Sequence, residues 1–421
     1  MKKLNIKTRN SIILISLLVC LTVLFLFLQP YVTGVYGWSE DKILAEGRYL
    51  SNPKITIDSD DNVHMVWYMG GVNTSGVYYT KLDKKGNTVV STKIIEQRVR
   101  IFAIVTNSQN SLYLIYSNYS GIYYKKIDLH GTVVNESILL TNSTAKFSID
   151  ASIDSKDNVH IVWDRDLISY IVINKNGNII GKETTISSGK SSHPKVTIDI
   201  EDNTHVVWRG ENGIYYTKMG KLFCPIINAT QITSDCWSGC DIAVDSQCNA
   251  HIVYDNRNIS YLKLNNIGEK IKTRTLAKYQ PSGFVGFPSI TIDKWDNVHI
   301  AWQADTFRGV AVHYMKLDKN GNILIDDTQL THHLRLIIWW SAGHPDIAAD
   351  SHGNAHVIWR EHFGVWDATT DRICYKTNAH TNMALLIEYI IIVIAVLSTI
   401  TLIGIYLIKK KTYAPKRIRK S

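Results

Sequence analysis

The stretch DNVHIVW at Asp157–Trp163 recurs along the chain with small changes. Its near-copies read DNVHMVW, DNTHVVW, CNAHIVY, DNVHIAW and GNAHVIW, and each carries a histidine. Aligned on the Asp of the preceding segment, His follows six residues later and Trp or Tyr nine residues later. The aligned positions are Asp58, His64 and Trp67; Asp154, His160 and Trp163; Asp199, His205 and Trp208; Asp245, His251 and Tyr254; Asp293, His299 and Trp302; and Asp350, His356 and Trp359. Self-similarity at a nearly fixed period is typical of repeat architectures.

A worn copy fills the long gap between the first two of these repeats. It reads FAIVTNSQNSLYLIY and places Asn107 at the Asp position, Tyr113 at the His position and Tyr116 at the Trp position. The chain therefore contains seven repeats, spaced 49, 47, 45, 46, 48 and 57 residues apart.

Each repeat contains four strand signals. The patterns PxITID, VHxVW and GIYYTKLD are followed by a fourth β-rich run, and Asp-Asn or Asn-Gly turns separate them. No helical period appears between the two terminal apolar segments. Four short strands repeated seven times predict an all-β fold, a seven-bladed β-propeller. The last repeat ends at its third strand (372–377), so the segment 41–47 is expected to supply the missing fourth strand and to close the ring.

The repeated histidines are interpreted as structural. Equivalent residues of a propeller stand one per blade around a ring, so six His cannot converge on one metal ion. Each is expected to form a hydrogen bond near the Asp of its own turn, since Asp caps such turns through backbone N–H groups. The Trp that ends the strand is expected to pack between blades. No metal and no cofactor are predicted.

The charge of the chain is concentrated at its ends. The 421 residues are 45% hydrophobic and carry a net charge of +9, but 11 of the 46 Lys and Arg residues flank the two terminal apolar segments. The remainder, 35 basic against 37 acidic residues, is nearly neutral. Nucleic-acid binding is therefore not expected, because there is no basic stripe.

The two apolar segments predict attachment to a membrane. Residues 1–37 are either a signal peptide, cleaved after VYG, or an uncleaved signal anchor around 11–28. Residues 384–408 form a predicted transmembrane helix, followed by a basic cytoplasmic tail at 409–421. The propeller, residues 38–380, is then expected outside the cell membrane.

The spacing of the cysteines is compatible with a location outside the cell membrane. Cys224, Cys236, Cys240 and Cys248 cluster within 25 residues, which suggests one or two disulfides in an oxidising compartment. A zinc site is the alternative, although the spacings match no common zinc pattern. Six Asn-x-Ser/Thr sequons are compatible with glycosylation.

A ligand site is expected where the loop after the second strand meets the loop between blades. An arginine recurs in that loop in five repeats, at Arg165, Arg209, Arg257, Arg308 and Arg360. Carboxylates accompany them, among them Asp164, Asp305 and Glu361. Pointing into the axial mouth, these residues would form a ring able to bind acidic sugars, since Arg binds carboxylates through two hydrogen bonds. The alternative is that each Arg pairs with its neighbouring acid in solvent.

The loop LIIWWSAGHP holds Trp339 and Trp340. Exposed, these two residues would form a patch for a partner or for the membrane surface. They could equally cover the mouth or pack internally.

The pattern PxIxxDxxGNxHVVW followed by IYYxKxDxxG resembles repeats of the sialidase-like and NHL-like propeller superfamilies. The resemblance covers residues 41–378, and its best copies are PKVTIDIEDNTHVVW (Pro194–Trp208) and PDIAADSHGNAHVIW (Pro345–Trp359). It is greatest to secreted or surface-anchored propellers of prokaryotes, with an archaeal source expected. The sialidase Asp box, SxDxGxTW, and the arginine motif that opens a sialidase domain are both missing from the sequence.

Three functions remain open at this point. The leading hypothesis is a non-catalytic cell-surface protein that binds a glycan or a protein, because no nucleophile–base constellation breaks the repeat. A sialidase-like glycoside hydrolase or lyase would need two carboxylates facing each other across the mouth. A structural component of the cell envelope would need no pocket, and fold alone does not choose among these three.

Overall fold

The computed structural model describes residues 37–71, 75–128, 130–278, 284–306, 309–331, 339–365 and 368–379, with only the backbone at 339, 340, 365, 368 and 369. Glu40–Ala379 forms one compact unit. The predicted membrane segments at 11–28 and 384–408 lie outside the described residues. Within the described ranges, no helix has the length and apolarity needed to cross a membrane.

The described part of the chain is all β. Five of its sheets have four strands each. They are β2 (Leu50–Ile57), β3 (Val63–Met69), β4 (Gly76–Leu82) and β5 (Thr88–Gln97); β6 (Ile101–Thr106), β7 (Leu112–Ser117), β8 (Ile122–Ile127) and β9 (Ile138–Thr141); β10 (Ile149–Ile153), β11 (Val159–Asp164), β12 (Ile168–Ile173) and β13 (Ile179–Thr185); β14 (Ser191–Ile198), β15 (Thr204–Gly210), β16 (Gly213–Met219) and β17 (Pro225–Gln231); and β18 (Cys240–Val244), β19 (Ala250–Asp255), β20 (Ile259–Leu264) and β21 (Lys270–Ala277).

A sixth sheet has eight strands and consists of two halves. One half contains β22 (Val285–Ile292), β23 (Val298–Thr306), β24 (Gly309–Leu317) and β25 (Ile323–Gln329). The other contains β26 (Trp339–Ala349), β27 (Ala355–Val365), β28 (Ala368–Thr377) and β1 (Lys42–Gly47). A single parallel bridge, Val310↔Ser341, joins the halves, whereas the pairings inside each half are antiparallel. The predicted repeat of four strands is therefore confirmed.

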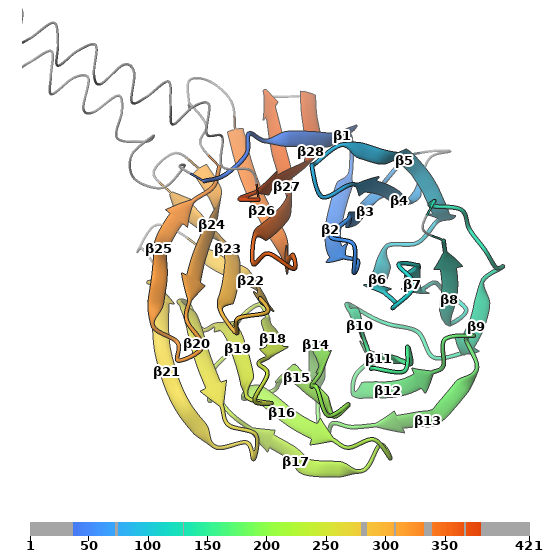
Figure 1. Ribbon diagram of the computed structural model, residues 1–421, viewed down its shortest axis with the longest axis vertical. Coiled ribbons are helices and arrows are strands. Elements are labelled where there is room, and N and C mark those ends of the chain that lie inside the picture. The colour runs from blue at the N-terminus through green and yellow to red at the C-terminus, as the bar shows by residue number, and fades with distance from the viewer. Residues whose placement is uncertain are drawn as a thin grey trace, which may run out of the picture. The chain divides into compact units, whose positions relative to one another are not determined.

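The sheets of this unit stand around a common centre, as Figure 1 shows. Each innermost strand contacts the next one along the chain, in the order β2, β6, β10, β14, β18, β22 and β26, and β26 contacts β2 again. The arrangement is a β-propeller. The worn repeat forms a regular sheet, β6–β9, so its assignment as a repeat is confirmed as well.

The ring closes as predicted, because a strand from the start of the chain pairs with the last repeat. Strand β1 pairs antiparallel with β28, from Lys42↔Tyr375 to Gly47↔Asp371. An ion pair of 2.9 Å joins the Lys376 ammonium to the Asp41 carboxylate just before β1. A segment from the start of the chain thus supplies the outermost strand of the sheet formed by its last repeat.

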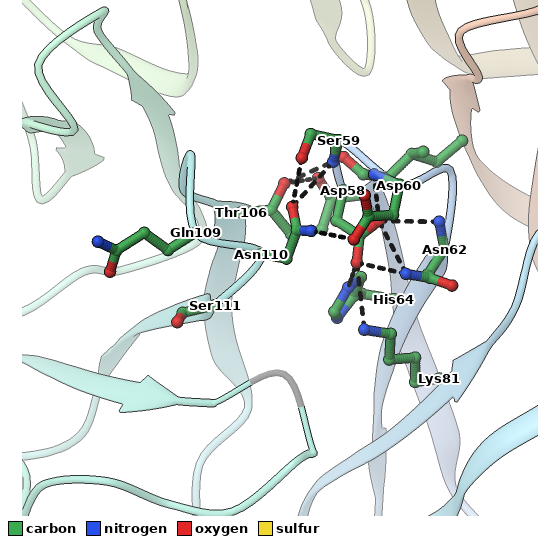
Figure 2. A network of polar contacts seen from close by, with 12 residues as sticks. Asp58, Ser59, Asp60, Asn62, His64, Lys81, Thr106, Gln109, Asn110 and Ser111 are labelled. Carbon is green, nitrogen blue, oxygen red and sulfur yellow. Dashed lines mark hydrogen bonds and ion pairs between the residues drawn. The ribbon is translucent and has the colours of Figure 1, made fainter.

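Each repeated Asp is the centre of a buried polar network, shown for Asp58 in Figure 2. Its carboxylate accepts the backbone N–H groups of Asp60 and Asn62 and the ring N–H of His64 at 3.0 Å. Lys81 on β4 lies 3.1 Å away. The hydrogen bonds hold the pKa of Asp58 below its usual range although burial alone would raise it. An ionised carboxylate only accepts hydrogen bonds, so His64 carries its proton on Nε2.

The second ring nitrogen of the histidine faces a tyrosine of the third strand. The Tyr79 hydroxyl lies 3.0 Å from His64 Nδ1 and donates to it. The same Asp–His–Tyr arrangement recurs in five other repeats, with His–Tyr distances of 2.6–2.9 Å. The worn repeat keeps a reduced version, in which the Asn107 amide donates directly to the Tyr113 hydroxyl at 2.9 Å.

The turns that hold these Asp residues also bond to one another across neighbouring sheets. A serine after the Asp of one turn donates its backbone N–H and its hydroxyl to an Asp of the next turn. These Ser–Asp contacts are Ser108–Asp157, Ser155–Asp202, Ser246–Asp296 and Ser351–Asp61. Ser59 bonds to Asn110 in the same way. At the remaining two junctions other residues occupy the positions of the serine and its acceptor. They are Ile200 and Cys248 at one junction, and Lys294 and Gly353 at the other.

The aromatic residues that end the second strands lie in the core. Trp67, Trp163, Trp208, Trp302 and Trp359 are almost fully buried, and Tyr254 and Tyr116 take their place in the other two repeats. Each packs among aliphatic residues of its own and the adjacent sheet, as Trp163 does between β10 and the β6–β9 sheet. Burying side chains of this size contributes much of the apolar area that stabilises the propeller.

The predicted disulfides are wrong for this structure. Cys224, Cys236, Cys240 and Cys248 are all free thiols. Cys224 is exposed in the turn between β16 and β17, whereas Cys248 is buried in the turn before β19. Cys240 begins β18 and packs in the core with Cys236. Cys224 and Cys248 thus lie in different environments from each other, whereas Cys236 and Cys240 share one core cluster as free thiols.

Replacing Asp199 by Ala tests the buried network. The change removes the acceptor for His205, Asn203 and Lys218 and leaves a buried ammonium unpaired, so we expect a loss of about 3–5 kcal/mol in the free energy of unfolding. The matched control is Asp318→Ala, because Asp318 caps an exposed turn through the same backbone bonds but contacts no His. It should cost about 1 kcal/mol. Denaturant unfolding measures both, and equal losses would contradict the role of the network.

The same histidines predict how stability depends on pH. Burial lowers the pKa of His64, His205, His251 and His299 below 6.5. Below that pH the unfolded chain binds protons that the folded chain does not, so the stabilisation is complete above about pH 6.5 and is lost as the pH falls. Thermal unfolding between pH 7.5 and pH 4.5 should show a falling midpoint. A midpoint that is constant or rises over this range would overturn the prediction.

Candidate functional site

The face opposite the Asp-containing turns is here called the mouth face. Loops between sheets and hairpins between second and third strands meet there. A cavity of about 280 Å³ opens at its centre and is lined by the beginnings of the inner strands and the residues before them. Lys54, His193, Phe287, His344 and Asp346 are among its lining residues. Every sheet of the ring therefore contributes to one axial cavity.

Four inner strands carry the same backbone distortion at this cavity. Asn52, His193, Phe287 and His344 occupy the position six residues before the repeated Asp or its equivalent, and their φ values are 50–54°. The register of each strand shifts there, as expected for a β-bulge. A left-handed conformation in a non-glycine residue costs free energy, and such residues cluster at functional sites.

The bulges place two imidazole–phenyl pairs at the cavity. His344 packs against Phe287 with ring centroids 4.1 Å apart, and His193 stacks on Phe147 at 5.8 Å. Burial lowers the pKa of His344 to about 4, and the charges of Arg360 and Lys54 add to the shift. Burial also lowers the pKa of His193. Both rings are therefore neutral at pH 7 and offer a polar edge beside an aromatic face.

Charged side chains surround the axis below these rings. They stand four residues before the repeated Asp. Lys54 pairs with Asp346 at 3.7 Å and Lys195 pairs with Asp241 at 3.6 Å. Asp150 accepts the N–H of Val196 at 2.9 Å, and burial raises its pKa. The residues alternate in sign between neighbouring sheets, so the charges largely neutralise one another inside the protein.

A second cavity, of about 500 Å³, lies beside the axial one and is here called the basic groove. Phe147 and His193 line both cavities, so the two are adjacent. Arg165, Lys190 and Arg209 line the basic groove, and none of them has an ion-pair partner among the described residues. Lys146 and the carboxylates of Asp164, Asp166 and Glu211 line the same cavity, so its cations exceed its acids by one. Asp164 is buried and bonded to backbone N–H groups, and Asp166 pairs with Lys146, so the free guanidinium groups of Arg165 and Arg209 favour an anionic ligand.

The candidate carboxylates of this face hold loops in place. Asp164 is buried and accepts the backbone N–H groups of Phe147, Ser148 and His193 at 2.9–3.0 Å. Asp305 accepts the N–H of Phe284 at 2.8 Å. Asp164 does not form an ion pair with Arg165, the arginine beside it in sequence.

Glu361 is also buried, and its carboxylate accepts the indole N–H of Trp359 at 2.9 Å. All three predicted carboxylates thus have a structural partner within the protein.

The five arginines do not form a single ring in the described part of the chain. Arg165 and Arg209 line the basic groove, but Arg257 lies over the Trp237 ring, 5.4 Å from its centroid. Arg360 bonds to Asp371 at 2.8 Å across β27 and β28, so its guanidinium already has a carboxylate partner. Arg308 lies outside the described residues. Trp339 and Trp340 have a described backbone in β26 but no described side chain, so the interpretations of their loop stay predictions.

Two sets of site residues were missed by the sequence analysis. The first set consists of charged residues that share one position in their repeats: Lys54, Asp150, Lys195, Asp241 and Asp346. The second set is the bulge residues, which share a different position. Both sets lie in the inner strand, which the pattern marks as buried. The signal that could have revealed them is charge at a strand position where a blade buried on both sides requires an apolar residue.

Neither a protein-family model nor a curated protein sequence matches this chain. Several solved structures resemble it. A protein from Lactobacillus plantarum is 11% identical, with 73% of this chain and 92% of that chain covered and a TM-score of 0.51. The polysaccharide lyase Uly1 is 11% identical over 76% of this chain and 89% of that chain, with a TM-score of 0.47. The Dos1 propeller is 9% identical over 73% and 75%, with a TM-score of 0.44. These likenesses concern the propeller fold alone.

Asp164→Ala tests whether this carboxylate shapes the mouth. Three buried backbone N–H groups would lose their acceptor, so we expect a loss of about 1–3 kcal/mol in the free energy of unfolding. Asp166→Ala is the matched control, since Asp166 is exposed and pairs only with exposed Lys146, and it should change stability by less than about 0.5 kcal/mol. Thermal unfolding compares the two, and the idea fails if Asp166→Ala is the more harmful change.

Proposed function

We propose that this protein is a seven-bladed, sialidase-like propeller at the cell surface that binds an acidic glycan on its mouth face without catalysis. The seven blades correspond to the five four-stranded sheets and the two halves of the eight-stranded sheet. Antiparallel pairing within each half and the single bridge between the halves support that count. Surface attachment rests on the apolar segments at 11–28 and 384–408 and on their basic flanks.

The basic groove carries this proposal. Arg165 and Arg209 can each bind a carboxylate or sulfate group through two parallel hydrogen bonds, and Lys190 adds a third charge. The Phe147–His193 pair lies where the groove meets the axial cavity, and a phenyl face packs well against the apolar face of a sugar ring. Cations beside an exposed ring match the chemistry of an acidic sugar.

The positions of the carboxylates support binding over hydrolysis. Glycoside hydrolysis commonly uses two carboxyl groups on either side of the scissile bond, about 5–9 Å apart. Asp164, Asp305 and Glu361 each accept hydrogen bonds from the protein itself, and Asp346 at the axial cavity is paired with Lys54. The predicted carboxylates are thus held by the protein itself, and the other carboxylates that line the basic groove are Asp166 and Glu211.

A glycan array probed with the purified full-length protein tests the proposal. We expect binding to sugars that carry carboxylate or sulfate groups, with affinity falling as salt is added, because exposed charges are screened. The Arg165→Ala, Arg209→Ala double variant should lose about tenfold or more, since each charge-assisted hydrogen bond contributes about 1.5–3 kcal/mol.

Arg274→Ala is the control, because Arg274 lies on β21, the outer strand of its sheet, away from the mouth. It should leave binding unchanged. If folded protein binds no acidic sugar, the proposed function is wrong.

A further inference from the structure

Exposed aromatic side chains are concentrated on the mouth face. Five aromatic residues are strongly exposed in the described part of the chain. Tyr49, Tyr119, Phe147 and Trp237 lie in loops or hairpins of the mouth face, whereas Trp295 alone lies in a turn of the opposite face. Large exposed aromatic residues contribute little to the core and are typical of binding surfaces.

Trp237 is held in place although its ring is 51% exposed. Its backbone N–H bonds to the Asp255 carbonyl at 2.9 Å, and the next N–H, of Ser238, bonds to the Asp255 carboxylate at 2.6 Å. The Arg257 guanidinium lies over the indole, 5.4 Å from its centroid. The loop is therefore ordered before any ligand arrives, and a preformed surface binds with a smaller entropy cost.

Trp237 directly precedes two residues of the axial cavity, which is adjacent to the basic groove. The residues after it, Ser238 and Gly239, line the axial cavity together with His193. Burial raises the pKa of the Cys236 thiol to about 12, and the charge of Arg209 opposes that shift, so Arg209 is near enough to act electrostatically on the residue that precedes Trp237. Phe147, which is 58% exposed, stands at the other end of this path.

Ring faces and guanidinium groups thus alternate over three neighbouring sheets, those beginning with β10, β14 and β18. A monosaccharide in the basic groove would contact one ring face and leave Trp237 unused. A polymer with flat apolar faces and an anionic group on each unit would match the whole path. An acidic peptide offers charge, but it lacks a regular series of flat rings to lie on Phe147 and Trp237.

We infer that the mouth face binds an extended acidic polysaccharide, with sugar rings stacked on Phe147 and on Trp237 and anionic groups at Arg165, Arg209 and Arg257. This inference rests on the proposed function and adds a second stacking subsite, at Trp237, and a polymeric ligand. Binding should therefore strengthen with chain length until both rings are covered.

Titration calorimetry on the full-length protein tests the inference with oligouronates and sulfated oligosaccharides of two and eight residues. In the series that binds, the eight-residue chain should bind at least about tenfold more tightly than the two-residue chain. Trp237→Ala should remove that gain and leave the two-residue affinity unchanged. Trp237→Phe keeps a flat ring and should retain part of the gain in affinity. It therefore keeps the test valid if the Ala variant misfolds.

Trp295→Ala is the matched control. Trp295 is 53% exposed and has Lys294 over its ring at 4.5 Å, but it lies on the opposite face, so its loss should not change affinity for either length. Arg209-dependent binding with equal affinity for both lengths would overturn the inference and leave the proposed function standing. Tighter, Trp237-dependent binding of polyglutamate would also overturn it, in favour of an acidic peptide. If neither sugar series binds to folded protein, the inference and the proposed function both fail.

Discussion

The buried carboxylate at the end of six of the seven inner strands is the constraint on which the rest of the propeller depends. Asp58 and its equivalents collect the N–H groups of their own turn, a histidine of the second strand and, in several sheets, a lysine of the third. A buried charge is tolerated only when its hydrogen bonds are satisfied, so the carboxylate fixes three strands relative to one another. The histidine is a component of this network, which explains its repetition without any metal or catalytic role.

At the mouth face, too, a carboxylate accepts backbone N–H groups, but there it holds a loop in place. The acid that ends a second strand, such as Asp164, holds the loop that leads into the next sheet. That arrangement fixes the bulged residue His193 and its ring partner Phe147 at the axial cavity. Because the acids are occupied by the backbone, the cations beside them stay available. The charge character of the groove follows from this division between acids that shape the loops and arginines that face outward.

The repeat made the architecture predictable, because period, turn residues and strand patterns all agreed. Even the strand exchange between β1 and β28 could be inferred, since the last repeat lacked its fourth strand. The site was less predictable. A residue predicted in a loop can instead lie in a strand, as Arg360 does in β27, or over a neighbouring ring, as Arg257 does over Trp237, and sequence spacing does not show which. The axial charges at Lys54 and Asp241 were missed because an inner strand was assumed to be buried among apolar groups.

Ring closure has a mechanical consequence. Strands β1 and β28 are antiparallel, and the chain enters β1 and leaves β28 at the same end of their pairing, near Lys42 and Tyr375. A force that pulls these two ends apart loads the hydrogen bonds one after another, beginning at that end, and never all of them together. Tension along the chain would therefore unzip the ring at its closing sheet, while the other sheets, each formed by one continuous stretch of chain, would still carry no load.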